Sequence, residues 1–516
     1  MTGSRDDSVS PRLVHEILDL AAARFPHRAA VRDITGGWTY ADLHRHAGEA
    51  AADLRSQGVR AGDRVLSLLP PSRQSVALLF AAVRIGAVLV PVAPATAPYR
   101  LRWLLADADP SLVVAEGEQA ARARSLSAVP VVEPGRLKAA RPVAAAASGG
   151  APPAVLSTAL TAAGDALATV GEEDPALMLY TSGSTAQPRA VVCPHARVVF
   201  AARAIADRLR YTPEDVVYCC LPFSFDYGLY QVFLCALAGA ELVFGGTAVD
   251  GGLLRGIRGA GATVLPVVPT LAELLAWLAR RDRERSALRL ITNTGAALTQ
   301  AHAAGLRFAA PSARVVAMYG TTECKRITIA EPDEHLSRPG TVGGPLHGTR
   351  ILVVDDDDRT LPPGATGQIV AVGPHVMAGY WAASGHTAGG FRPAPDSGEP
   401  SFYTGDYGHL DHTGRLYVAG RRDDLFKRRG VRISVQEIEA AMLDIPEVRG
   451  AAVLPPGPDG RLLAWAVTSL TPRQVRAGVG ERLGGAGTPD VCVVTEELPR
   501  TTNGKVDKLA LRLSGS

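Results

Sequence analysis

The amino-acid sequence predicts an α/β protein with more than one domain, and three observations support that prediction. Up to about residue 340, short apolar segments alternate with amphipathic ones, as in strands and helices packed in layers. Farther along the chain, short strand-like segments are separated by Gly, Pro and Asp turns, which is typical of a small β-barrel-like subdomain. With 516 residues the chain is longer than a single hydrophobic core usually organises.

The first part of the chain predicts the beginning of these layers. Residues 12–60 are expected to form a helix, a hairpin-like segment and a second helix, because apolar residues recur there at helical spacing. Apolar strands are predicted at 63–69 and 87–92, with a helix between them. Residues 115–172 are rich in Ala, Pro and Gly, which predicts that they are partly loop, with one candidate strand near Val129.

A regular alternation of strands and helices continues through the middle of the chain. Strands are predicted at 177–180, 216–221, 241–244, 263–268, 288–292 and 313–318, and helices at 195–209, 229–239 and 251–260. Polar motifs follow three of these strands, beginning at Leu221, Asn293 and Tyr319. Because ligands collect at the carboxyl ends of parallel strands, the sequence predicts that these motifs share one cleft.

The last third of the chain predicts shorter elements. Strands are expected at 350–354, 367–372 and 414–418, and residues 383–400 have the composition of a mobile surface loop. A small α/β domain is predicted from about residue 424 onward, with a helix at 435–443 and strands near 451 and 491.

Composition excludes several classes of protein. The net charge of +3 gives no reason to expect a nucleic-acid partner. The six cysteines are scattered without metal-ligand spacing, which favours reduced thiols in a cytoplasmic protein. No signal peptide is recognised at the start, and the long apolar run from Val76 to Val92 is interrupted by Arg84, so we expect no membrane partner.

The segment from Leu177 to Arg189 is the strongest candidate for a ligand-binding loop. An apolar run enters Thr181, Ser182, Gly183, Ser184 and Thr185, where small residues, hydroxyls and exposed N–H groups suit a phosphate. Arg189 adds a fixed positive charge. The loop lacks the Gly-Lys-Ser/Thr order of a Walker motif, and by composition alone a surface turn explains it equally well.

The order of this loop resembles the signature of the adenylate-forming superfamily of acyl-CoA synthetases, adenylation domains and luciferases. Motifs in matching order span nearly the whole chain, at Trp38-Thr-Tyr, Leu221-Pro-Phe-Ser-Phe-Asp-Tyr-Gly228, Asn293-Thr-Gly-Ala296, Tyr319-Gly-Thr-Thr-Glu323, Tyr403-Thr-Gly-Asp406, Gly420-Arg-Arg-Asp423, Lys427-Arg-Arg-Gly430 and Pro499-Arg-Thr-Thr-Asn-Gly-Lys505. The resemblance implies a large N-terminal domain over residues 1–422 and a small mobile lid over 423–516, joined by a hinge at Asp423.

The resemblance also implies a two-step reaction. A carboxylate and MgATP give an acyl-adenylate and pyrophosphate, and the acyl group then passes to a thiol. ATP and Mg2+ are therefore the expected cofactors. Because two anions meet in the first step, charge neutralisation and positioning should dominate catalysis.

Nucleotide-binding roles are carried over to the residues that match the family motifs. The phosphates are expected on Thr181, Ser182, Gly183, Ser184, Thr185 and Arg189, and the adenosine on Gly295, Ala296, Ala297, Tyr319, Gly320, Thr321, Asp406 and Arg421. The loop departs from the family pattern, since Ala186 and Ala190 replace glycines and Arg189 replaces a lysine. Ala186 would be disfavoured at a position of positive φ, so a slower or tighter loop is expected.

Four residues are expected to act in catalysis. By resemblance, Glu323 would bind magnesium, Thr322 would contact the α-phosphate, and Lys505 would bridge the substrate carboxylate and the α-phosphate. Lys427 lies where the second-step face of the lid would form.

Substrate recognition is expected from residues that line the acid side of the cleft, namely Asp226, Tyr227, Tyr230, Thr294, Met318, Arg326 and His195. Asp226 aligns with the position that holds an α-amino group in amino-acid-adenylating domains, although capping of the following helix explains it equally well. Arg326 would either pair with Asp226 or another acid, or recognise a polar acyl group. His195 is similar to a histidine that gates the cleft.

These residues predict a stand-alone ligase that activates an amino acid or related small acid and loads it onto the phosphopantetheine arm of a carrier protein in trans. The rival interpretation is an acyl-CoA ligase that uses free CoA. An ATP-binding pseudoenzyme, from a different functional class, is disfavoured by the joint presence of Glu323, Asp406 and Lys505.

Overall fold

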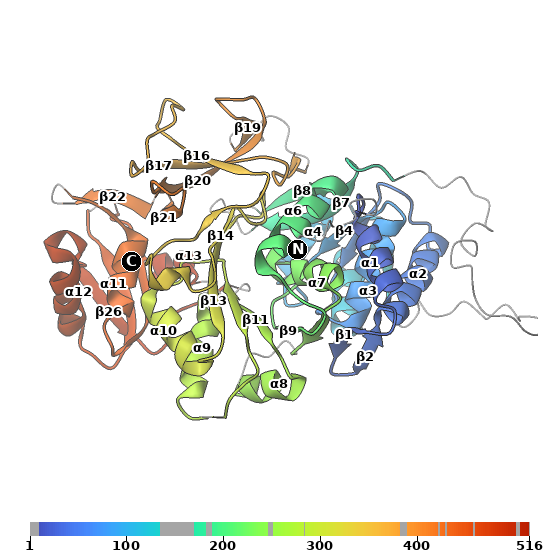
Figure 1. Ribbon diagram of the computed structural model, residues 1–516, viewed down its shortest axis with the longest axis horizontal. Coiled ribbons are helices and arrows are strands. Elements are labelled where there is room, and N and C mark those ends of the chain that lie inside the picture. The colour runs from blue at the N-terminus through green and yellow to red at the C-terminus, as the bar shows by residue number, and fades with distance from the viewer. Residues whose placement is uncertain are drawn as a thin grey trace, which may run out of the picture.

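The fold is described from a computed structural model of the chain (Figure 1). The structure describes residues 10–134, 170–181, 188–245, 251–282, 284–381, 390–421, 424–428, 431–457, 460–501 and 506–514. Three sheets make up a large N-terminal part, and a smaller C-terminal domain follows.

The first large sheet has seven strands in the order β18(Gly379–Tyr380), β8(Arg189–Pro194), β7(Pro175–Thr181), β4(Val88–Pro91), β3(Arg64–Ser67), β5(Leu112–Val114) and β6(Val131–Val132). Strands β7, β4, β3, β5 and β6 pair in parallel, whereas β7 and β8 form an antiparallel hairpin. In the sequence, the predicted phosphate loop connects these two strands.

The second large sheet has nine strands in the order β15(Gly344–Pro345), β14(Thr328–Ile329), β13(Arg314–Tyr319), β12(Leu290–Asn293), β11(Val264–Val267), β9(Val216–Cys219), β10(Glu241–Phe244), β1(Ala29–Asp33) and β2(Gly36–Thr39). Its central strands are parallel. Strands β11 and β12 are buried along their whole length, as expected for parallel strands covered on both faces.

Helices fill the space between the two sheets. Helix α3(Arg73–Arg84) contacts β4 of one sheet and β1 of the other, and α7(Asp226–Ala238), which is almost entirely buried, packs against α6(His195–Leu209). Helices α1(Val14–Arg24) and α2(Tyr40–Ser56) complete this layer. One continuous hydrophobic core joins these helices to both sheets.

Other helices cover the outer faces of the sheets (Figure 1). Helices α4(Pro98–Ala108) and α5(Gly117–Leu126) form a second core with the seven-stranded sheet. Helices α8(Leu253–Ala260), α9(Pro269–Ala279) and α10(Gln300–Ala309) contact strands of the nine-stranded sheet. The helix-covered sheets confirm the predicted α/β layers.

The predicted β-barrel-like subdomain is a five-stranded antiparallel sheet. Its order is β16(Arg350–Val354), β17(Gly367–Val372), β20(Pro400–Leu410) and β19(Phe391–Pro393), with β21(Leu416–Arg421) also paired to β20. The short 3₁₀ helix η3(Glu334–Leu336) and β14–β15 precede it in the chain.

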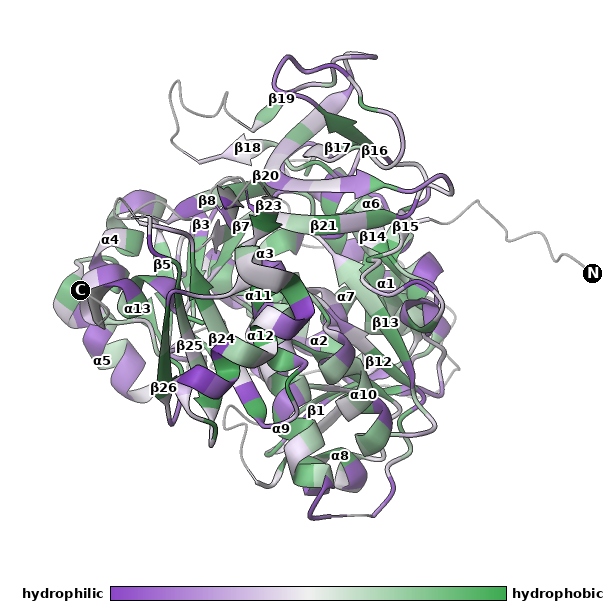
Figure 2. Cartoon of the chain, turned by 90° about the vertical axis from the view of Figure 1, so that its left-hand side faces the viewer, coloured by the Kyte–Doolittle hydropathy of each residue, from purple (hydrophilic) through white to green (hydrophobic). Residues whose placement is uncertain are grey.

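The C-terminal domain has its own core. It contains β22(Leu425–Arg428) and β23(Val431–Ser434), the sheet β24(Val448–Leu454), β25(Leu463–Thr468) and β26(Val491–Thr495), and the helices α11(Val435–Leu443), α12(Pro472–Gly487) and α13(Lys508–Ser514). Figure 2 shows β26 in the green of hydrophobic residues, whereas α12 mixes both colours as a half-exposed helix does. Arg500 lies 3.4 Å from the Glu273 carboxylate of α9 and so links this domain to the large one.

Most predicted elements are confirmed, including the helices at 195–209 and 435–443. Helix α5 differs from the loop expected there, because it buries only Ala120 and Ala123 and its apolar periodicity is weak. Helix α7 begins at Asp226 and not at 229. The predicted domain boundary at 422/423 and residues 382–389 of the predicted surface loop lie outside the described residues. Among the described helices, none is both long enough and apolar enough to cross a lipid bilayer.

Candidate active site

The predicted site motifs converge where the two large sheets meet. Asp226 follows β9, Thr294 follows β12 and Gly320 follows β13, so all three leave the carboxyl ends of parallel strands of one sheet. The β7–β8 hairpin of the other sheet brings Thr181 and Arg189 into register with each other. This arrangement agrees with the general position of ligand sites in open α/β sheets.

Part of the predicted phosphate loop lies outside the described residues, namely Ser182, Gly183, Ser184 and Thr185, together with Ala186. Its two ends are described. The Thr181 hydroxyl donates to the Arg189 carbonyl at 3.4 Å, and the Arg189 guanidinium lies 5.3 Å from the centre of the Tyr380 ring. Arg189 is therefore held at the base of the loop by a cation–π contact.

A cluster of Tyr319, Asp406 and Arg421, the nucleotide-side cluster, joins the nine-stranded sheet to the five-stranded sheet. The Tyr319 hydroxyl donates to Asp406 Oδ2 at 2.6 Å, and Arg421 Nε lies 2.8 Å from Asp406 Oδ1. Asp406 and Arg421 face each other across the β20–β21 pair. Burial, and then the neighbouring carboxylate, raises the pKa of Tyr319, so its hydroxyl stays protonated as a donor.

The turn that follows Tyr319 allows no side chain at Gly320. A Cβ there would lie 2.0 Å from the Lys325 carbonyl oxygen, and the Ile327 N–H closes the turn by donating to the Tyr319 carbonyl at 2.8 Å. Thr321 and Thr322 are half-buried in this turn. The close backbone approach explains why glycine is needed between Tyr319 and the threonines.

Glu323 is buried at the end of the same turn. Its Oε1 accepts a 2.6 Å hydrogen bond from the hydroxyl of Tyr380 on β18. A buried carboxylate is a hard oxygen ligand, which fits Mg2+ bound together with phosphate oxygens.

Asp226, Tyr227 and Arg326 form a second cluster, the acid-side cluster, between α7 and β14. Arg326 Nη1 lies 3.1 Å from Asp226 Oδ2, and the guanidinium stands 4.7 Å from the centre of the Tyr227 ring. The N-cap of α7 is Phe225 and no side chain caps the helix, so Asp226 serves the ion pair and not a cap. Of the contacts expected for Arg326, the structure contains the pair with Asp226.

Lys325 was not singled out by the sequence, yet it is completely buried beside Arg326. Its Nζ donates to the Thr322 carbonyl at 2.8 Å and lies 3.2 Å from Cys193 Sγ. Burial raises the pKa of the Cys193 thiol, so the sulfur is not the counter-ion of this lysine. The available signal was the pair of adjacent cations, Lys325 and Arg326, at the start of an otherwise apolar segment.

The structure also describes the remaining residues predicted for the substrate and the adenosine. Tyr230 is buried, its ring centre lies 5.9 Å from Lys325 Nζ, and its hydroxyl has no hydrogen-bond partner among the described residues. Thr294 and Met318 are buried at the ends of β12 and β13. After Thr294, Gly295 has φ +91°, a conformation that favours glycine, and Ala296 and Ala297 are exposed.

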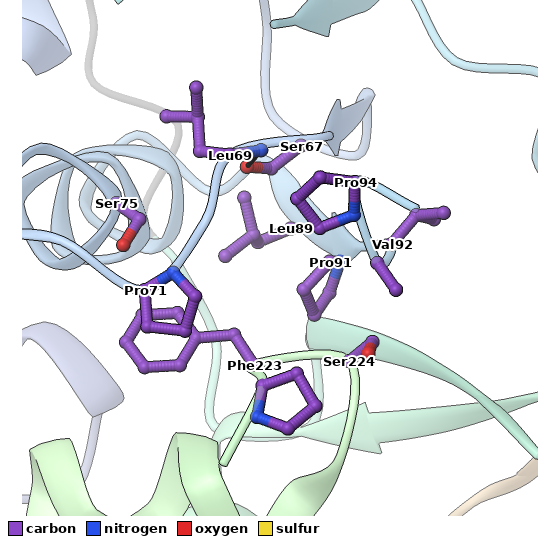
Figure 3. A pocket seen from close by; sticks show the side chains of 12 residues that line it. Ser67, Leu69, Pro71, Ser75, Leu89, Pro91, Val92, Pro94, Phe223 and Ser224 are labelled. Atoms are coloured by element: carbon purple, nitrogen blue, oxygen red, sulfur yellow. Dashed lines mark hydrogen bonds between the residues drawn. The ribbon is translucent and has the colours of Figure 1, made fainter. Parts of the chain in front are cut away.

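A small pocket lies between the ends of β3 and β4 and the loop that leads into α7 (Figure 3). Ser67 and Pro91 line it from the ends of β3 and β4, and Phe223 and Ser224 line it from the loop that leads into α7. The pocket therefore opens where the two large sheets face each other.

The structure does not bring His195 into either cluster. Its ring is completely buried, and Nδ1 accepts a 3.0 Å hydrogen bond from the Val14 N–H at the start of α1. Burial lowers the pKa of His195 to about 4, so the ring is neutral near pH 7. The expected gating contact with the cleft is replaced by a structural contact between α6 and α1.

The structure describes no side-chain contact for the two lysines that were expected to act in catalysis. Lys427 lies on β22, and only its backbone pairing with Arg432 is described. Lys505 lies outside the described residues.

The chain matches the family model for AMP-binding enzymes over residues 18–381 and the model for their C-terminal domain over residues 437–505. A probable non-canonical nonribosomal peptide synthetase of Salinispora arenicola, CymA, is 31% identical over 97% of this chain. This chain spans only 6% of that protein and 20% of the plipastatin synthase subunits A and C of Bacillus subtilis.

Two relatives of similar length represent two kinds of acceptor. An L-proline–[L-prolyl-carrier protein] ligase of Pseudomonas fluorescens is 28% identical, with 97% of this chain and 99% of the relative covered. A medium-chain fatty-acid–CoA ligase of Escherichia coli is 29% identical, with 95% and 88% covered.

Solved structures are also similar. VinN in complex with L-aspartate is 41% identical with a TM-score of 0.69, over 79% of this chain and 98% of that one. VinN in complex with 3-methylaspartate is 39% identical with a TM-score of 0.64, over 78% and 98%. ATP-bound MatB of Rhodopseudomonas palustris is 27% identical with a TM-score of 0.82, over 97% and 98%. From the two family models, the order of its motifs and its fold, the chain belongs to the family of AMP-binding enzymes.

Proposed function

We propose that the protein is an AMP-forming ligase that activates an amino acid with a second carboxylate and passes the aminoacyl group to the phosphopantetheine thiol of a carrier protein. The first step joins the substrate carboxylate to the α-phosphate of ATP and releases pyrophosphate. The transfer step forms a thioester and releases AMP. The observation that carries the choice of substrate is the buried group formed by Asp226, Lys325 and Arg326.

The charges of this group favour an amino dicarboxylic acid. Asp226 and Arg326 neutralise each other at 3.1 Å, which leaves the buried Lys325 as an additional cation. A buried charge is costly unless an opposite charge accompanies it, and a second substrate carboxylate would supply that charge. An ammonium group on the same substrate would be stabilised by Asp226.

Similar proteins support this choice. VinN, whose structures hold L-aspartate and 3-methylaspartate, has the highest sequence identity to this chain among the structures compared above. The prolyl-carrier protein ligase, which matches this chain nearly end to end, supports a carrier protein as the acceptor.

Residues of the nucleotide side would neutralise and orient ATP. Glu323 would hold Mg2+, which supplies charge neutralisation at the phosphates when bound, and Thr322 would contact the α-phosphate. Arg189 and the hydroxyl loop would hold the phosphates, Tyr319 would stack on adenine, and Asp406 would accept from the ribose. Lys505 would stabilise charge where the carboxylate meets the α-phosphate.

An acyl-CoA ligase is the second candidate, and the medium-chain fatty-acid–CoA ligase of similar length favours it. The two candidates share the first step and differ in the acceptor. Comparing free CoA with a phosphopantetheinylated carrier protein as acceptors of the activated acid separates them.

ATP–pyrophosphate exchange with three acids tests the proposed substrate class. L-Aspartate, L-asparagine and succinate have closely similar sizes, so asparagine removes the second carboxylate charge and succinate removes the amine. We expect both analogues to be activated at least about 10-fold less efficiently than L-aspartate or 3-methylaspartate. Asparagine would leave the buried Lys325 without a counter-ion, and succinate lacks the ammonium group that Asp226 would stabilise.

The same assay includes the results that would contradict the proposal. Equal exchange with aspartate and asparagine would exclude a role for the second carboxylate, and equal exchange with aspartate and succinate would exclude the amine. Exchange with neither aspartate, 3-methylaspartate nor any neutral amino acid would reject amino-acid activation altogether.

A further inference from the structure

A short segment, here called the strap, connects the turn that carries Glu323 to strand β8, which begins with Arg189. It runs from Val376 to Trp381 and contains β18, which pairs antiparallel with β8. At its start the Met377 N–H donates to the Glu323 carbonyl at 2.8 Å, and at its end the Trp381 N–H donates to the Ala190 carbonyl at 2.8 Å. The strap is therefore hydrogen-bonded both to the turn that carries Glu323 and to the strand that begins with Arg189.

Tyr380 is the residue of this strap whose side chain contacts both functional groups. Its hydroxyl donates to Glu323 Oε1 at 2.6 Å, while the Arg189 guanidinium lies 5.3 Å from the centre of its ring. The edge-to-face contact with Phe391, at 5.2 Å between ring centres, limits rotation of the tyrosine ring.

The hydroxyl and the ring of Tyr380 contact different groups. The hydroxyl donates to one oxygen of the Glu323 carboxylate and so restricts the rotation of that group. The ring holds the positive charge of Arg189 by a cation–π contact. A ligand group whose rotation is restricted in this way loses less entropy when it binds its cation.

We infer that Tyr380 is a positioning residue for the metal and phosphates, acting through Glu323 with its hydroxyl and through Arg189 with its ring. This inference rests on the proposed function, in which Glu323 binds Mg2+ and Arg189 binds phosphate. Neither the motif order nor the family-derived roles assigned above include Tyr380.

Binding of Mn2+, a paramagnetic substitute for Mg2+, tests the inference without turnover. Electron paramagnetic resonance measures the affinity of the full-length protein for Mn2+ in the presence of ATP and without any acid substrate. We expect Tyr380→Phe to weaken Mn2+ binding about 10-fold, since it removes one hydrogen bond to a charged group and keeps the ring. In steady state, the same variant should raise the Mg2+ concentration needed for half-maximal exchange more than it lowers kcat.

A second substitution separates the ring from the hydroxyl. Tyr380→Leu removes the cation–π contact as well, so we expect ATP binding measured without metal to weaken in Tyr380→Leu but not in Tyr380→Phe. Trp381→Phe is the matched control. Trp381 lies on the same strap, and the substitution removes its 3.1 Å hydrogen bond from Nε1 to the Asp107 carbonyl. That control should leave both Mn2+ and ATP binding unchanged.

A double variant tests whether the hydroxyl acts through the carboxylate. In a Glu323→Gln background, Tyr380→Phe should produce no further loss of Mn2+ affinity. Circular dichroism of each variant detects a failure to fold. If Tyr380→Phe alone does not fold, Tyr380→Leu is compared with wild type, and the double variant is compared with Glu323→Gln.

The outcomes separate this inference from the proposed function. If the wild-type protein binds no Mn2+ in the presence of ATP, the proposed function fails. If the wild type binds Mn2+ and Tyr380→Phe binds it equally well with the same Mg2+ requirement, Tyr380 is only structural and the inference is overturned. An equal loss in Trp381→Phe would likewise overturn it, since the whole strap and not Tyr380 would then be responsible.

Discussion

The nucleotide-side and acid-side clusters contain the same three residue types in different surroundings. Asp406 accepts from Tyr319 and pairs with Arg421, and the side chain of the arginine is 56% exposed and that of the aspartate 12%. Asp226 pairs with Arg326, which lies over Tyr227, and the two charged side chains are only 4% and 5% exposed. Water therefore reaches one arginine–aspartate pair and is nearly excluded from the other.

This difference determines what each pair contributes. An exposed pair adds little to stability because solvent screens it, so its residues remain available for a ligand. A buried pair has already lost its hydration, and removing one partner leaves an uncompensated charge. The acid-side cluster should therefore discriminate strongly between substrates of different charge. In the nucleotide-side cluster, contacts between Asp406 and Arg421 should be replaced by contacts to a ligand with little loss of free energy.

Removal of the buried cation is the largest expected effect. Arg326→Gln leaves Asp226 buried without its counter-ion, so we expect the free energy of unfolding to fall by about 3–5 kcal/mol. Denaturant unfolding followed by circular dichroism measures this change. Adding Asp226→Asn should recover most of the loss, because position 226 then no longer carries a buried charge without its partner.

The recovery in the double variant shows whether Arg326 stabilises the protein through its charge or through its packing. If the double variant is as unstable as Arg326→Gln alone, the arginine stabilises through its stacking on Tyr227 and not through its charge. The contrast between the two clusters would then concern packing.

The residues proposed for the nucleotide are easier to group from the sequence than those proposed for the acid, for a physical reason. Most of the residues proposed for the nucleotide lie in short contiguous segments, such as Tyr319 to Glu323, whose order alone is informative. The pair between Asp226 and Arg326 joins residues 100 positions apart and forms only after β9 and β13 lie in one sheet.

Two residues escaped prediction for related reasons. Lys325 has a positive φ of 61° and points into the core, although a lysine is usually assigned to the surface from sequence. Tyr380 lies on a two-residue strand, too short for any periodic signal. His195 shows the opposite error, since the family pattern suggested the cleft and the fold buries its ring against α1.

Acidic pH should destabilise the protein through His195, which belongs to neither cluster. Its pKa is about 4 when folded and 6.5 as the ordinary value, so the unfolded chain binds one more proton between these pH values. Stability is therefore full above about pH 6.5 and falls as the pH decreases, by up to about 3 kcal/mol near pH 4.

His195→Asn tests this expectation because an asparagine Oδ1 can accept from the Val14 N–H in place of the imidazole nitrogen. The variant should lose the part of the acid dependence between pH 6.5 and 4 that wild type shows in denaturant unfolding. An unchanged pH profile would show that His195 is not the group responsible for that dependence.

Removal of the exposed cation is the smallest expected effect on stability and completes the comparison. Arg421→Gln should lower the free energy of unfolding by less than about 1 kcal/mol, since solvent already screens its pair with Asp406. Asp406 keeps its 2.6 Å hydrogen bond from Tyr319, so its carboxylate is not left without a donor. Unfolding in denaturant measured beside Arg326→Gln gives the ratio of the two effects. A loss as large as that of Arg326→Gln would mean that the nucleotide-side pair is as desolvated in solution as the acid-side pair, and the proposed division between a discriminating and an exchangeable side would fail.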